Sequence, residues 1–250
     1  VLMKLTVALP RSRPAHLTGI PAPEGCDAPA LVLTAQDGKR YIAERDPAMP
    51  MYHVQLPAIE AGQQVAFDVS PLVDPAAAPG IAYTQAGEQV DVTLAGSPFM
   101  TFHHGPSYPK PVINPIWTPG GVNMLREPMP AYTGGEHPWQ RGLTLMQGAI
   151  NGVDCWNERD EPGFGHTVQD TMQISQGSLS MWIASTNTWY EQDRPLMTDT
   201  RWYRLFDTPR DAVVLDISLT LKASHGAITI GATKEGGFLC LRVNPTMNAA

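Results

Sequence analysis

Apolar and polar residues alternate with a period of two through most of the chain. In VVLDISLTL (213–221), an apolar residue occupies every second position, which is the pattern of a half-buried strand. Shorter segments of the same kind predict further strands at 5–9, 30–35, 40–44, 52–56, 64–69, 89–94, 178–185 and 200–206. No segment carries the apolar stripe of an amphipathic helix over three turns, so little helix is expected.

Two segments near the end of the chain complete this pattern. AITIGAT (227–233) follows the turn KASHG and predicts a hairpin with 213–221, and FLCLRV (238–243) is apolar on both faces and predicts a central strand. The 22 glycines and 24 prolines suit many short strands joined by turns. We therefore predict an all-β fold, an antiparallel two-sheet sandwich or supersandwich with long loops.

Chain length and the positions of proline and glycine residues indicate the domain organisation. The 250 residues are expected to form a single β-sandwich domain. DPAAAPG (74–80) is either an edge loop or a linker, and the second reading gives an N-terminal β-unit 1–80 and a main portion 81–250. We expect the C-terminus to be truncated. The pattern changes at 97–165, a proline-rich and aromatic-rich stretch that predicts a long ordered excursion over one face, where sites tend to lie.

Composition narrows the range of molecules that the protein is expected to bind. The net charge of −7 and the lack of a basic cluster argue against nucleic acid. Three widely spaced cysteines indicate neither disulfides nor zinc. The opening residues do not have the pattern of a signal peptide, and no apolar run is long enough to predict a membrane span, so a soluble, cytoplasmic protein with a small-molecule partner is expected. Nucleotide-binding and serine-hydrolase motifs are absent, and no cofactor is expected. The oligomeric state stays open.

The densest polar stretch, GGEHPWQRGLTLMQGAINGVDCWNE (134–158), supplies the candidate catalytic residues. His137 and Arg141 lie on one predicted turn and suit proton transfer beside a held oxyanion. The competing reading is structural, with His137 on a backbone carbonyl and Arg141 paired to Glu136 or Asp154. Asp154 and Glu158, on a second predicted turn, would orient His137, act as acid and base, or cap the turn.

Further residues are candidates for substrate binding. Trp139 and Trp156 are more often core than platform, yet exposed tryptophans stack on sugars. Lys234 and Glu235 precede two glycines, where one of them would reach a cleft or both would lie on a solvated turn.

If the adjacent residues His103 and His104 lie on a strand, their side chains point to opposite faces, so at most one of them faces the site. A metal centre from one of this pair with His137 and His166 lacks a tight ligand spacing, so no metal is expected.

Three motifs in order resemble a known family. GPSYPKPVINPIWTPGG, EHPWQRGLTLMQGAINGVDCWNE and GATKEGGFLCLRV are similar to bacterial proteins labelled methane oxygenase PmoA-like, a domain of unknown function linked to carbohydrate catabolism. Relatives carry D-H-P-H-H-R-G. His137, Pro138, Arg141 and Gly142 match it, whereas Trp139 and Gln140 replace histidines. The label implies a metal-dependent oxygenase, although the methane monooxygenase subunit lies in the membrane. The resemblance implies a galactose-mutarotase-like supersandwich.

Together these features predict a carbohydrate-processing enzyme, a hydrolase, lyase or epimerase, working by general acid–base chemistry. The alternatives are a non-catalytic sugar-binding module and, less favoured, a metal-dependent oxygenase. The predicted strand LTLMQ separates the two polar turns by about 17 Å. We therefore expect the His137–Arg141 turn, rather than Asp154, to form the site.

Overall fold

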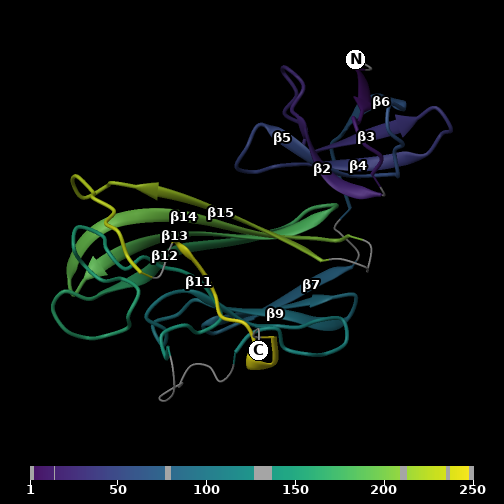
Figure 1. The fold of residues 1–250 in the computed structure, drawn as a ribbon. Helices are drawn as coiled ribbons and strands as arrows, with labels where there is room; N and C mark the ends of the chain where they lie inside the picture. Colours follow the sequence, from purple (N-terminus) through teal and green to yellow (C-terminus); the bar gives the residue numbers. More distant parts are fainter. Residues whose placement is uncertain are drawn as a thin grey trace. The chain divides into compact units, whose positions relative to one another are not determined.

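The fold is built almost entirely from β-strands. The computed structural model describes residues 3–13, 15–76, 80–126, 137–208, 213–234 and 237–247. Within these residues the only helical element is a single 3-10 turn, η1 (Pro245–Met247). The strands form three antiparallel sheets (Figure 1). The predicted all-β class with little helix is confirmed.

The chain divides into two compact units. Unit 1 comprises Val1–Pro79, Ser175–Trp182 and Arg204–Leu215, and unit 2 comprises Gly80–Ile174, Ile183–Tyr203 and Asp216–Ala250. The first boundary, between residues 79 and 80, falls within the segment 74–80. The return of two later segments to unit 1 has no counterpart in the sequence pattern.

Unit 1 contains a six-stranded sheet. Its strands, in spatial order, are β1 (Met3–Ala8), β6 (Gln64–Leu72), β3 (Ala30–Ala35), β4 (Arg40–Arg45), β5 (Met51–Leu56) and β2 (His16–Pro21). The core of this unit gathers apolar side chains from neighbouring strands, among them Leu31, Leu33, Tyr52, Val54 and Phe67. Their alternate spacing along each strand is what places them on a common face.

Two buried acidic residues of unit 1 bind the segments of this unit that come from later in the chain, Ser175–Trp182 and Arg204–Leu215. Glu44 on β4 accepts hydrogen bonds from the backbone nitrogens of Leu179 at 2.6 Å and Ser180 at 3.0 Å, and from the Ser180 hydroxyl. Asp46 accepts one from Nη1 of Arg204 at 2.7 Å and also contacts His53 at 2.7 Å. These carboxylates are buried and matched by donors, as a buried charge requires.

Unit 2 contains a second six-stranded sheet. In spatial order its strands are β16 (Leu239–Leu241), β11 (Leu143–Leu145), β10 (Val112–Ile116), β9 (Ser97–His103), β8 (Gln89–Leu94) and β7 (Ile81–Ala86). The predicted excursion 97–165 therefore contains three strands of a regular sheet. The pairing of β10 with β9 shifts register between Ile113 and Ile116, where Pro115 offers no backbone donor.

The third sheet consists of longer strands. Its order is β12 (Gly165–Gln176), β13 (Ser180–Glu191), β14 (Arg194–Phe206) and β15 (Val214–Lys222), and Figure 1 draws them as long curved arrows. Within unit 2 it packs on the second six-stranded sheet, because the rings of Phe102 on β9 and Tyr203 on β14 lie 5.3 Å apart.

Two strand predictions near the C-terminus are wrong. The segment 227–233 forms no strand and only an isolated bridge from Ile230 to Ile150. FLCLRV contains the three-residue edge strand β16, with Leu239 55% and Leu241 54% exposed and Cys240 buried. Apolar residues on both faces therefore do not mark a central strand here.

Candidate functional site

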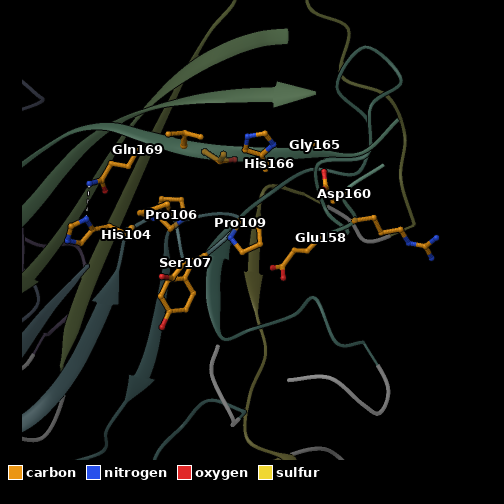
Figure 2. Close-up of a pocket in the computed structure, with 15 residues that line it drawn as sticks. His104, Pro106, Ser107, Pro109, Glu158, Asp160, Gly165, His166 and Gln169 are labelled. Carbon is orange, nitrogen blue, oxygen red and sulfur yellow. Dashed lines mark hydrogen bonds between the residues drawn. The ribbon is translucent and has the colours of Figure 1, made fainter. Parts of the chain in front are cut away.

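A cavity in unit 2, lined by both apolar and polar groups, is the candidate site. It has a volume of about 450 Å³ and is lined by residues 104–109, 111, 158–160 and 165–169. Figure 2 shows these three segments around one space, with His104 and Gln169 at one end and Asp160 and His166 at the other. Its size falls in the range of small-molecule sites.

The first wall is the loop that follows β9. Glu88 holds this loop, since its carbonyl accepts a hydrogen bond from the His104 nitrogen at 3.0 Å and its carboxylate accepts one from the Ser107 nitrogen at 3.1 Å. A Cβ at Gly105 would lie 2.0 Å from the Glu88 side chain, so a larger residue at this position would displace that side chain. The Pro109 carbonyl accepts from the Thr167 nitrogen at 2.9 Å and ties the loop to β12.

The second wall contains Glu158, whose side chain is only 2% exposed. Its Oε2 accepts a hydrogen bond from Nε of Arg141 at 2.5 Å, and its Oε1 lies 3.4 Å from Nζ of Lys110. Glu158 thus lies between two cationic side chains at the inner wall of the cavity.

Lys110 lies behind the cavity wall and is almost fully buried. Its ammonium donates to the Trp156 carbonyl at 2.7 Å and contacts the Met146 sulfur at 3.3 Å. Burial lowers the pKa of Lys110, and Glu158 opposes this effect. Nothing in the sequence pattern singled out Lys110, because a lysine between two prolines reads as an exposed loop residue.

Arg141 is positioned by the backbone around it. Its carbonyl accepts a hydrogen bond from the buried Asn114 side chain at 2.8 Å. Gly142 follows at φ 130°, and a Cβ there would lie 2.7 Å from the Ile113 carbonyl oxygen. The turn after Arg141 therefore needs glycine. Arg141 is not among the described residues of the cavity lining, but it pairs with Glu158, which is.

Asp154 organises the second turn. Its carboxylate accepts hydrogen bonds from the backbone nitrogens of Trp156 at 2.8 Å and Asn157 at 3.1 Å, and from the Asn157 side chain at 2.6 Å. The Cys155 nitrogen also donates to the Gln147 carbonyl at 3.1 Å. The chain after β11 therefore turns back and returns Glu158 to Arg141, whereas the sequence predicted that the strand would keep the two turns apart.

The histidines of the cavity have different environments. Nδ1 of His104 lies 3.2 Å from the Gln169 amide nitrogen, and the His166 ring stacks on Tyr190 at 5.5 Å. His103 does not line the cavity. It contacts the Asn114 carbonyl at 2.9 Å. Burial lowers the pKa of both His103 and His104.

The other predicted site residues lie outside the cavity lining. His137 is exposed at φ 55°, and its carbonyl accepts a hydrogen bond from Arg126 at 2.8 Å. Trp139 is half-buried and Lys234 is exposed. Trp156 is 5% exposed and packs in a core cluster with Met146 and Cys240, so its ring faces are not open to a sugar. Glu235 is outside the described residues.

Several cavity residues were not proposed for a site from sequence. Asp160, Ser107, Tyr108 and Gln169 all line it, and His166 was considered only as a metal ligand. The available signal was the spacing of Pro106, Pro109 and Pro111 around Ser-Tyr, which marks a stiff loop. Within the described part of the chain, no group of three or more His, Cys, Asp or Glu residues is arranged to hold a metal ion.

Comparison with known proteins adds the family. In the described ranges, no helix has the length and apolar character needed to cross a membrane. No curated protein matches the chain. Residues 89–250 match a family of unknown function, DUF6807, and this match covers more than half of the chain and every segment of the cavity. The chain therefore belongs to the DUF6807 family.

Proposed function

We propose that the cavity binds and processes a carbohydrate by general acid–base chemistry. The observation that carries the proposal is the composition of the cavity wall. Carboxylate, imidazole, hydroxyl and amide groups of Asp160, His166, Ser107 and Gln169 alternate with the rings of three prolines and Tyr108. A sugar presents hydroxyls that both donate and accept, and C–H faces that pack on such rings.

In this proposal the roles differ from those expected from sequence. His166 and Asp160 are the groups that exchange protons with the substrate, because both line the cavity and neither is held in an ion pair within the described residues. Glu158 supplies a fixed negative charge that favours a developing positive charge. Arg141 and Lys110 are positioning residues that hold Glu158. The carbohydrate class is supported by the resemblance of three sequence motifs to a family linked to carbohydrate catabolism.

The experiment measures binding and turnover separately. Saturation-transfer NMR with D-glucose, D-galactose, D-xylose and their disaccharides identifies a bound sugar, and NMR of the same mixtures over hours detects a product. The variants His166→Ala and Asp160→Asn should lose turnover about 100-fold or more. The matched controls, His225→Ala and Asp193→Asn, change exposed residues outside the cavity and should behave as wild type.

A sugar-binding module is the second candidate, favoured by the ion pairs of Glu158 with Arg141 and Lys110, which engage the more buried of the two carboxylates in the cavity wall. It predicts sugar binding without product, and loss of binding in Tyr108→Ala. The proposal as a whole is overturned if the wild-type protein binds none of these sugars.

A further inference from the structure

A second cavity lies in unit 1, at the end of β1 and the start of β2. It has a volume of about 230 Å³ and is lined by Leu9, Pro10, Arg11, Arg13, His16 and Thr18. The segment lies outside residues 89–250, so the DUF6807 match does not extend to it. Nothing proposed above for unit 2 involves this cavity.

The sequence RSRPAHLT explains how the polar side chains meet. Arg11 and Arg13 are two positions apart, as are His16 and Thr18. Arg11, Arg13, His16 and Thr18 all line the cavity, whereas Ser12 and Leu17, which lie between them, do not. Ser12 instead donates from Oγ to the Glu60 carboxylate at 2.7 Å. The nearby acidic group is therefore engaged by the serine.

The charge of the lining is one-sided. Its described residues include two arginines, a histidine and a threonine and no carboxylate, although the chain has 24 acidic residues against 17 basic ones. Among the described residues, neither the Arg11 nor the Arg13 guanidinium forms a hydrogen bond or an ion pair. Elsewhere in unit 1, Arg45 and Arg204 are paired with aspartates.

This chemistry selects the ligand class. All four polar side chains can donate hydrogen bonds, and two carry a permanent positive charge. The Thr18 hydroxyl can also accept a hydrogen bond, so the preference for an oxyanion rests on the two positively charged guanidinium groups. Guanidinium groups bind phosphate through paired N–H donors, and a phosphate offers several oxygens to the donors of this lining. We propose that this cavity binds a phosphate group, either inorganic phosphate or the phosphate of a small phosphomonoester.

The experiment is calorimetric titration of the full chain with inorganic phosphate, glycerol 3-phosphate and acetate, in a low-salt zwitterionic buffer. Saturable 1:1 binding of a phosphate compound is expected. Whichever of the two compounds binds more tightly shows whether the ligand is inorganic phosphate or a phosphomonoester. Arg11→Gln or Arg13→Gln should weaken binding about tenfold, the loss of one charged hydrogen-bond partner. Both side chains are exposed, so the variants should melt as the wild type does.

The control variant is Arg40→Gln, which removes an exposed arginine on β4 of the same unit and should leave phosphate affinity unchanged. The proposal is overturned if the wild type shows no saturable phosphate binding. It is equally overturned if the Arg11→Gln/Arg13→Gln double variant binds as tightly as the wild type, or if acetate binds as tightly as phosphate. None of these outcomes depends on whether unit 2 binds a sugar.

Discussion

Arg141 and Glu158 are 17 positions apart in the chain and are joined by a hydrogen bond of 2.5 Å from Nε to Oε2. Lys110 approaches the other oxygen of the same carboxylate at 3.4 Å. One buried anion therefore separates two cations. The three residues come from the loop before β10, the turn before β11 and the chain that follows β11, so their contacts connect these three segments.

Removal of that anion should destabilise the protein strongly. In Glu158→Gln, Arg141 and Lys110 keep their charges without a counter-ion, and breaking a buried pair in this way costs about 3 kcal/mol or more. Urea denaturation measures the free energy of unfolding. The control is Glu161→Gln, because Glu161 is 53% exposed in its pair with Arg159 and surface pairs contribute about 0–1 kcal/mol. Equal losses in the two variants would contradict a buried ion cluster.

Lys110 should make stability depend on alkaline pH. Burial holds its folded-state pKa below 10.5, so between the two pKa values the unfolded chain binds more protons. The free energy of unfolding then rises with pH, by at most about 1.4 kcal/mol per unit. Wild type should gain stability relative to Lys110→Met as the pH is raised toward 10.5. A constant difference between the two proteins across pH 7–10.5 would show that the pKa is not lowered.

Asp154 should contribute to stability through its turn. Asp154→Ala removes three hydrogen bonds and should cost about 1–3 kcal/mol by thermal or urea denaturation. Asp154→Asn keeps an acceptor oxygen for the two backbone nitrogens and should recover at least half of the loss. If the two variants are equally destabilised, the charge rather than the acceptor geometry matters.

The buried cysteines should resist alkylation. Burial raises the pKa of Cys155 to about 12 and that of Cys240 to about 11, so at pH 8 few of these thiols are ionised. Iodoacetamide should therefore label Cys26, which is only partly buried, well before the other two. Peptide mass spectrometry gives the order, and in urea all three should react. Early labelling of Cys155 in the native protein would contradict its burial.

Period-two alternation predicted most strands that pair on both sides, such as β3, β4 and β6. It missed three edge strands, β2, β7 and β12, and also β9 and β10, which pair on both sides but lie in the stretch predicted as an excursion. An edge strand pairs on one side only and is exposed over much of its length, as in β7, where five of six residues are exposed. Burial then imposes little pattern on its sequence.

The candidate site was predictable only in part. Glu158 and His104 line the cavity, and their polar context in the sequence pointed to them. The meeting of Arg141 with Glu158 was not predictable, because it depends on the backbone reversal after β11 and on the hydrogen bond from Cys155 to Gln147. His137 and Trp139 were predicted from their residue type alone. Residue type does not show whether a side chain lines the cavity, and neither of these does.

The anchoring of Ser180 by Glu44 sets a limit on how the protein can be divided for expression. A fragment that starts at the family boundary, residue 89, would keep Ser175–Trp182 and Arg204–Leu215 but remove the rest of unit 1. The backbone donors of 179 and 180 and the guanidinium of Arg204 would then lose the carboxylates of Glu44 and Asp46. The homology boundary is therefore not a folding boundary, and a fragment for crystallisation should retain the N-terminal strands.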